Sequence, residues 1–176
     1  MLRRTGFVKK LTTPLKRTQL ARNVALKASG SPIATSKRVK GKQVARKTKT
    51  LAKWKKELDA VFSKWIRLKY SDGNGNCACY TCGKVMHWKS IQNGHFISRQ
   101  YLATRWHENN CRPQDVGCNI YGNGKPLDFE ERLKKELTSD YVEDMKMLRH
   151  KSLKLDHHWY SEQITFYGAK VERLLQ

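Results

Sequence analysis

The cysteines between residues 77 and 118 have the spacing of a metal-binding site. Cys79 and Cys82 stand in the sequence CYTCG, where two thiolates separated by two residues can bind one ion and the following glycine lets the backbone turn back. Further along, Asp115 and Cys118 repeat this spacing with a carboxylate in place of one thiolate. Because zinc is tetrahedral and accepts sulfur and carboxylate oxygen, we expect zinc on Cys79, Cys82, Cys118 and one more residue.

The fourth zinc ligand is either Asp115 or Cys111. Spacing favours Asp115, whereas the affinity of zinc for thiolates favours Cys111. The five cysteines are an odd number, and the N-terminus lacks the apolar core of a secretory signal, so metal is favoured over disulfides and Cys77 is the unpaired thiol. We expect the zinc to be structural, because it supplies folding energy to a small domain.

His95 is the candidate for acid–base chemistry. It lies in the segment IQNGHFIS, directly after Gly94 and shortly after the cysteine pair. An imidazole has an unperturbed pKa of about 6.5 and can therefore accept a proton near neutral pH. A histidine taken alone is more often a buried, hydrogen-bonded part of a core, so the cysteine frame beside it is what favours a catalytic role.

One long helix is expected before the cysteines. Residues 51–70 place apolar side chains at spacings of three and four, which predicts an amphipathic helix with a basic outer face. We expect Trp54 and Trp65 to lie in the core, and Gly73 and Gly75 to end the helix.

The cysteine region and the C-terminal third differ in periodicity. The stretches KVMHWKS and IQNGHFIS, residues 84–90 and 91–98, are short and close together, which predicts the two strands of a hairpin. Helices next to a small antiparallel sheet make an α+β fold. Three helices are expected after the cysteines: residues 127–137 with Asp128 near the start, residues 139–151 capped by Ser139 or Asp140, and residues 161–176 capped by Ser161.

Positive charge is concentrated at the N-terminus. The formal net charge is +21, and residues 1–56 hold 18 of the 36 lysines and arginines and no acidic residue. The remaining residues carry 18 basic and 15 acidic side chains, a net of +3. This imbalance indicates a polyanionic partner. We expect residues 1–48 to be a disordered, DNA-binding arm and residues 49–176 to be the folded domain, with a transit peptide or a solubility tail as alternatives for the arm.

Four motifs follow one another in an order typical of one family. They are CYTCG at residues 79–83, NGHF at 93–96, RWHENN at 105–110, and QDVGCN at 114–119 followed by GNG. In this order the chain, over about residues 51–176, resembles the NinG family, also called Rap, of recombination proteins of lambdoid phages. That resemblance implies a zinc-stapled relative of the HNH nucleases, with a ββα-metal core and flanking helices, that acts on branched DNA.

The resemblance also implies roles for single residues. His95 would be the general base at a strand end, and Asn110 the asparagine that orients it. Asn119, next to the last zinc ligand, would hold the catalytic divalent ion together with His95. That ion would be Mg²⁺ or Mn²⁺ and would offset charge on the scissile phosphate. Gly94 would leave room for the phosphate backbone to approach.

The chain departs from the family pattern at two positions. Asp115 stands where the second zinc pair usually has its first cysteine, and Gly94 stands where many HNH nucleases have an Asp or His metal ligand. The second protein ligand of the catalytic ion is therefore open between Gln92, His107 and Glu108.

The function expected is that of a metal-dependent endonuclease that cleaves branched recombination intermediates such as Holliday junctions and D-loops. The alternatives are a non-catalytic zinc protein that binds DNA as a recombination accessory factor, and a general HNH nicking enzyme. We expect seven basic side chains to contact phosphates, with plain surface solvation as the alternative for the two in the folded domain: Lys9, Lys10, Arg38, Lys40, Lys42, Arg99 and Arg105.

Assembly and location follow from the same reasoning. Two incisions across a junction need two active sites, so we expect a homodimer, formed through the helices of residues 51–70 or 139–176. No apolar run is long enough to span a membrane, so we expect an intracellular protein, located in the host cytoplasm.

Overall fold

Helix α1 (Leu51–Lys69) begins where the sequence predicts, and it carries the largest apolar face of the domain. The side chain of Thr50 caps it by accepting a hydrogen bond from the backbone N–H of Lys53, and Arg67 and Lys69 lie in its last turn, where they complement the helix dipole. The computed structural model describes residues 49–176, so the proposed arm of residues 1–48, including Lys9, Lys10, Arg38, Lys40 and Lys42, lies outside the described residues.

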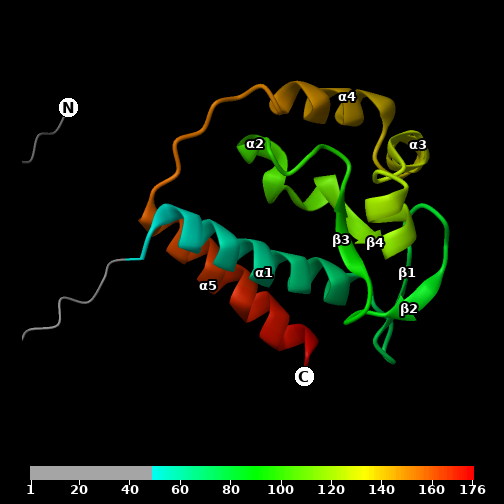
Figure 1. Ribbon diagram of the computed structural model, residues 1–176, viewed down its shortest axis with the longest axis horizontal. Helices are drawn as coiled ribbons and strands as arrows, with labels where there is room; N and C mark the ends of the chain where they lie inside the picture. The colour runs from blue at the N-terminus through cyan, green and yellow to red at the C-terminus, as the bar shows by residue number, and fades with distance from the viewer. Residues whose placement is uncertain (1–48) are drawn as a thin grey trace, which may run out of the picture. The chain divides into compact units, whose positions relative to one another are not determined.

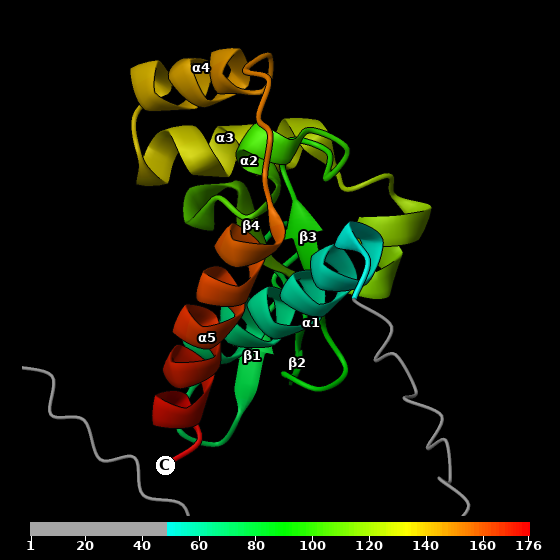
Figure 2. The ribbon, with the colours of Figure 1, turned by 90° about the vertical axis from the view of Figure 1, so that its left-hand side faces the viewer.

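Helix α5 (His157–Leu174) covers the apolar face of α1, so the first and the last of the described helices lie side by side (Figures 1 and 2). The ring of Tyr167 in α5 is 4.9 Å, between centroids, from both Phe62 and Trp65 in α1. Trp65 is buried and Trp54 packs against the same cluster, as predicted. Because this face of α1 is covered within the chain, it is not free to form the expected homodimer, which stays a prediction.

Two helix starts differ from the sequence-based expectation. Helix α5 begins four residues before Ser161, because the carboxylate of Asp156 accepts a hydrogen bond from the backbone N–H of Trp159 at 2.9 Å and caps the helix there. Helix α4 (Ser139–Leu148) is capped by Thr138 rather than by Ser139 or Asp140. In each case a polar residue upstream of the predicted one is the cap, by five residues in α5 and by one or two residues in α4.

The strands pair differently from the predicted hairpin. Strand β2 (Val85–His87) pairs antiparallel with β1 (Asn76–Ala78), and β3 (Gln92–His95) pairs antiparallel with β4 (Cys111–Gln114). The hairpin between residues 84–90 and 91–98 is therefore wrong. The guanidinium of Arg67 donates to the carbonyl oxygens of Trp88 and Ile91, at 3.1 and 3.4 Å, and so fixes the segment between β2 and β3 against α1.

The remaining elements surround the β3–β4 pair. Between these strands lie α2 (Leu102–Arg105) and a 3₁₀ turn (Glu108–Asn110), and after β4 comes the π-helical turn η2 (Gly117–Tyr121). Helix α3 (Pro126–Glu136) follows with Asp128 in its first turn, as predicted, and packs with α4 through Phe129, Leu133 and Val142. The mixed helix and sheet composition confirms the α+β class.

Strand β4 is tied to helix α3 by an ion pair between the buried Arg112 and the partly exposed Glu136. The guanidinium of Arg112 is 1% exposed and donates to a carboxylate oxygen of Glu136 at 2.7 Å, as well as to the carbonyl oxygens of Glu108 and Cys111. A buried guanidinium needs this full set of acceptors, because each unpaired N–H would cost free energy.

Among the helices of residues 49–176, none has the length and apolar character required to cross a bilayer.

Candidate functional site

Four side chains from three segments form a metal-binding cluster. The ligand atoms of Cys79, Cys82, Asp115 and Cys118 all lie within 4.8 Å of one another. Cys79 and Cys82 come from the turn between β1 and β2, Asp115 directly follows β4, and Cys118 lies in η2. Three thiolates and one carboxylate are a suitable tetrahedral set, so this cluster can hold a metal ion such as zinc.

Asp115 is held in place by its own chain. Its Oδ1 accepts a hydrogen bond from the backbone N–H of Gly117 at 2.7 Å, and its Oδ2 lies 3.2 Å from the sulfur of Cys82. Hydrogen bonds from the Cys118 and Cys79 thiols keep the pKa of the carboxyl far below its usual range, so it is an anion at neutral pH.

Cys111 is not part of the cluster, so the geometry favours Asp115 over Cys111 as the fourth ligand. Cys111 lies on β4 opposite His95, is fully buried, and has a pKa raised by burial to about 12. A thiol in that state is a packing group rather than a metal ligand. Cys77 is also buried outside the cluster, as the sequence predicts for an unpaired thiol.

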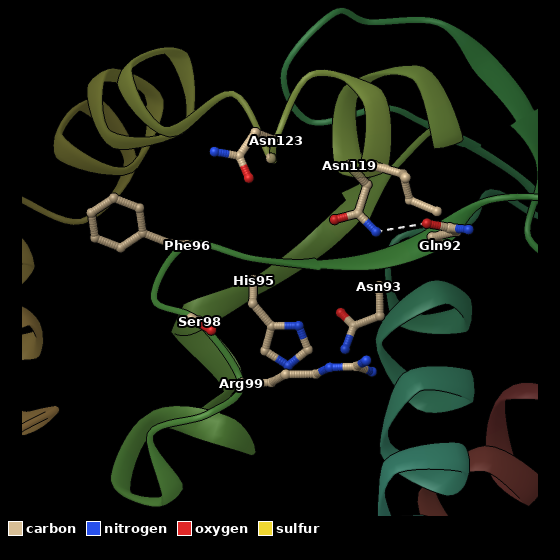
Figure 3. A pocket seen from close by; sticks show the side chains of 10 residues that line it. Gln92, Asn93, His95, Phe96, Ser98, Arg99, Asn119 and Asn123 are labelled. Atoms are coloured by element: carbon tan, nitrogen blue, oxygen red, sulfur yellow. Dashed lines mark hydrogen bonds between the residues drawn. The ribbon is translucent and has the colours of Figure 1, made fainter.

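A cleft of about 570 Å³ is lined by three of the predicted site residues, His95, Arg99 and Asn119. Figure 3 shows His95 and Arg99 on one side of strand β3 and Asn119 on the other. His95 comes from the end of β3, Arg99 from the loop that follows, and Asn119 from η2, one residue after Cys118. Its wall carries one arginine, one histidine and several amides, and none of its lining residues is acidic. The cleft is therefore suited to an anionic ligand.

The His95 imidazole is neutral and has a defined tautomer. Burial, with a smaller contribution from the positive charges of Arg105 and Arg99, lowers the pKa of His95 below its ordinary value. Its Nε2 lies 3.1 Å from the carbonyl oxygen of Arg105, which can only accept a hydrogen bond. The proton must therefore sit on Nε2, and Nδ1 is left with a free lone pair.

Arg105 is not available for phosphate, which makes this part of the sequence prediction wrong. Its Nε donates to Asp59 Oδ1 at 2.8 Å, its Nη2 to Asp59 Oδ2 at 2.5 Å, and its side chain is only 11% exposed. The indole N–H of Trp106 donates to the same carboxylate at 2.9 Å. Asp59 on α1 thus clamps the backbone whose carbonyl contacts His95. Arg99, by contrast, lines the cleft as a phosphate contact would.

Asn110 does not touch the imidazole that it was expected to orient. It is fully buried, and its three hydrogen bonds go to backbone groups of Ile97 and Thr104, at 2.7 to 3.0 Å. It closes the loop between His95 and Arg105 by joining both of its ends, so its influence on His95 is indirect.

Gly94 does not open space for a phosphate. A methyl group on Gly94 would lie 2.1 Å from Oε1 of Gln114, so the side chain of Gln114 fills the room that the glycine leaves. The Gln114 amide in turn donates to Thr81 in the β1–β2 turn and to the carbonyl oxygen of Gly124, at 3.1 and 2.9 Å. The expected role of Gly94 is therefore wrong, and the residue serves packing of the strand pair.

Of the three candidates for a second metal ligand, only Gln92 lines the cleft. Its Oε1 accepts a hydrogen bond from Nδ2 of Asn119 at 2.6 Å, which leaves the Asn119 carbonyl oxygen free (Figure 3). Glu108 pairs instead with Lys69 and Lys170, and His107 lies outside the cleft.

Two residues near His95 were not predicted as site residues from the sequence. Asn93 lines the cleft with a buried Oδ1 that has no hydrogen-bond partner among the described residues. It stands in the NGHF motif, so its position was a usable signal. Asp59 lies 46 residues before Arg105 on a helix with many charged residues, and nothing in the sequence distinguishes it.

One family model matches most of the chain. It is described as "Bacteriophage Lambda NinG protein" and covers residues 9–176, which extends the resemblance upstream from residue 51 into the basic segment. No curated protein and no solved structure matches the chain.

Proposed function

The chain belongs to the NinG family, and on that premise we propose that it is a metal-dependent endonuclease that cleaves branched DNA during phage recombination. The observation that carries this proposal is the cleft whose lining includes a neutral His95, Arg99 and Asn119, the direct neighbour of Cys118 in the metal cluster. An acid-free cleft fits a phosphate diester, and the base, the cation and the amide oxygen are the groups that its hydrolysis requires.

His95 acts as the general base. Its Nδ1 accepts the proton of the attacking water, while the Arg105 carbonyl keeps the other proton on Nε2 and stabilises the imidazolium that forms. The lowered pKa of His95 keeps the ring in its basic form at neutral pH. Arg99 binds a phosphate oxygen at the same cleft.

The donor set suits a weakly held divalent ion. Asn119 offers a free carbonyl oxygen, Gln92 orients it, and no carboxylate lines the cleft. When Mg²⁺ or Mn²⁺ is bound, it offsets charge on the scissile phosphate and the leaving oxygen. Because neutral amides bind such ions poorly, Asn119 would hold the ion mainly in the presence of the DNA phosphate.

The cluster of three cysteines and Asp115 has a structural role in this proposal, with zinc as its ion. Cys118 is the direct neighbour of Asn119, so a metal on the cluster fixes the backbone that presents Asn119 to the cleft. It also joins the β1–β2 turn to the end of β4. The order of two strands, β3 and β4, followed by the helical turn η2 supports the relation to ββα-metal nucleases.

The test is to incubate labelled four-way, D-loop and linear DNA with the full chain, with and without Mg²⁺ or Mn²⁺. We expect cleavage of the branched substrates only with metal, and its loss in His95→Ala with junction affinity nearly intact, because a base acts in the chemical step. His158→Ala is the matched control, since that histidine is 74% exposed on α5.

The alternatives give different results in the same assay. Binding without cleavage, indifferent to His95→Ala, would identify a non-catalytic accessory protein. Equal cleavage of linear and branched DNA would identify a general nicking enzyme.

A further inference from the structure

The turn η2 presents two large apolar side chains to solvent at the edge of the cleft. Ile120 is 58% exposed and lines the cleft that holds His95, and Tyr121, the next residue, is 85% exposed. Within residues 49–176 no other large apolar side chain is more exposed than Tyr121. Apolar groups in such a place, beside a site for a polyanion, indicate a ligand with an apolar face.

This turn is fixed at both ends before any ligand binds. The backbone N–H of Asn119 donates to the carbonyl of Asp115 at 2.8 Å, and those of Gly122 and Gly124 donate to Gly117 and Cys118 at 2.7 and 2.9 Å. Cys118 is also one of the four cluster residues. The two side chains therefore project from a rigid support, so little conformational entropy is lost when they bind.

The charges around the pair select the class of partner. The cleft that Ile120 borders contains Arg99, and none of its described lining residues is acidic. The side chain of Lys125 lies next to Gly122, directly after Tyr121: its Cε would be 3.0 Å from a Cβ atom at Gly122. A polyanion that also offers flat apolar surfaces matches this combination. Nucleic acid bases have such surfaces, but in an intact duplex they are stacked on one another and out of reach.

We propose that Ile120 and Tyr121 read the branch point of DNA by stacking on a base that is unpaired or unstacked there. Resting on the proposed nuclease function, this assigns the preference for branched over linear DNA to two side chains outside the catalytic group. A duplex has no free base to offer, so the contact forms only at a branch, a flap or a loop, and it places the adjoining phosphate in the cleft.

The experiment measures binding of the full-length protein, without divalent ion, to a four-way junction and to a linear duplex of the same sequence. The junction carries 2-aminopurine at the branch point, whose fluorescence reports stacking. Tyr121→Ala and Ile120→Ala should each weaken junction binding by about tenfold and abolish the fluorescence change, while duplex affinity stays constant. Tyr121→Phe should retain both signals. Phe166→Ala, which removes a ring 51% exposed on α5, is the control.

The inference would be overturned by an unchanged junction preference in Tyr121→Ala, by an equal loss of affinity for junction and duplex, or by the absence of any branch preference in the native protein. Conversion of a dimer to a monomer by Tyr121→Ala, seen by light scattering, would show that a second copy of the chain covers the pair instead. Because binding is measured without cleavage, a protein that stacks on the branch but does not cut would contradict the nuclease proposal alone.

Discussion

At His95, a single carbonyl oxygen decides which ring nitrogen carries the proton. That carbonyl belongs to Arg105, whose guanidinium and whose neighbour Trp106 are both held by the carboxylate of Asp59. The His95 ring is therefore oriented from helix α1, although α1 contributes no residue to the wall of the cleft. If Asp59 acts through Arg105 on His95, then removing the Asp59 carboxylate should change which nitrogen of the His95 ring carries the proton.

We expect Asp59→Asn to lower the cleavage rate by roughly 10- to 100-fold, since small displacements of a base have effects of this size. The variant loses the bidentate ion pair with Arg105 but keeps the shape of the side chain. The direct measurement is ¹⁵N NMR of the His95 ring, in which the proton should become shared between Nδ1 and Nε2. Asp144→Asn, at an exposed position on α4, is the control. An unchanged ring spectrum would show that Asp59 serves stability only.

Asn119→Asp should strengthen binding of Mn²⁺ to the protein without DNA by at least about tenfold, because it adds a carboxylate to a cleft wall that has none. Electron paramagnetic resonance of free Mn²⁺ gives the affinity directly. Asn74→Asp adds the same charge at an exposed residue that does not line the cleft, so it should leave the affinity for Mn²⁺ unchanged. If the two variants bind Mn²⁺ equally, Asn119 is not a ligand.

Among the elements, the turn η2 links the metal cluster to the cleft through the neighbouring residues Cys118 and Asn119.

The spacing of the cysteines predicted most of this cluster, because each ligand pair is local in sequence. The pairing of the strands was not predictable in the same way, because KVMHWKS and IQNGHFIS have similar strand character. Their partners are selected by long-range contacts such as that of Arg67 with Trp88. Asp59 was missed for the same reason.

Zinc content distinguishes the two candidates for the fourth ligand. Asp115→Ala should lose zinc during dialysis against a mild chelator and lower the melting temperature, since the metal supplies folding energy. Cys111→Ala should destabilise the protein by leaving a small cavity, yet keep one zinc per chain. Elemental analysis after dialysis decides between them, and equal zinc loss in both variants would contradict the assignment.

The close packing of Gly94 against Gln114 gives a test of the β3–β4 pair. Gly94→Ala should lower the free energy of unfolding by about 1–3 kcal/mol, because the new methyl group overlaps the buried Gln114 side chain. In the Gln114→Ala background the same change should cost much less. Urea denaturation of the four proteins measures this coupling. Additive losses would show that the two residues do not meet.

For the whole molecule, basic charge is concentrated at the N-terminal end of the chain. Residues 1–48 contain 14 lysines and arginines and no acidic residue, whereas the cleft and its selective groups all lie within residues 49–176. This distribution of charge can be read from the composition alone, because net charge needs no knowledge of the fold. We therefore expect the N-terminal segment to supply affinity that is independent of DNA shape.

Affinity for DNA falls with salt, and each phosphate that is neutralised on duplex DNA contributes about −0.9 to the slope of log affinity against log salt concentration. Deletion of residues 1–48 should make this slope less steep by roughly 3 to 8. Affinity should fall similarly for linear and branched DNA, so the preference for junctions should survive. Salt titrations of both substrates, with the full chain as reference, measure this. A lost preference with an unchanged slope would instead make residues 1–48 an element that reads DNA structure.

The packing of α5 on α1 has a consequence for the protein as it leaves the ribosome. Tyr167, which covers Phe62 and Trp65, is synthesised about 100 residues after them, a delay of roughly 5 to 20 s at ordinary rates of translation. During that interval the aromatic face of α1 has no cover from α5, and the nascent chain is a target for chaperones that hold apolar segments. Asp59 lies on the same helix, so we expect the clamp on His95 to become rigid only when synthesis is almost complete.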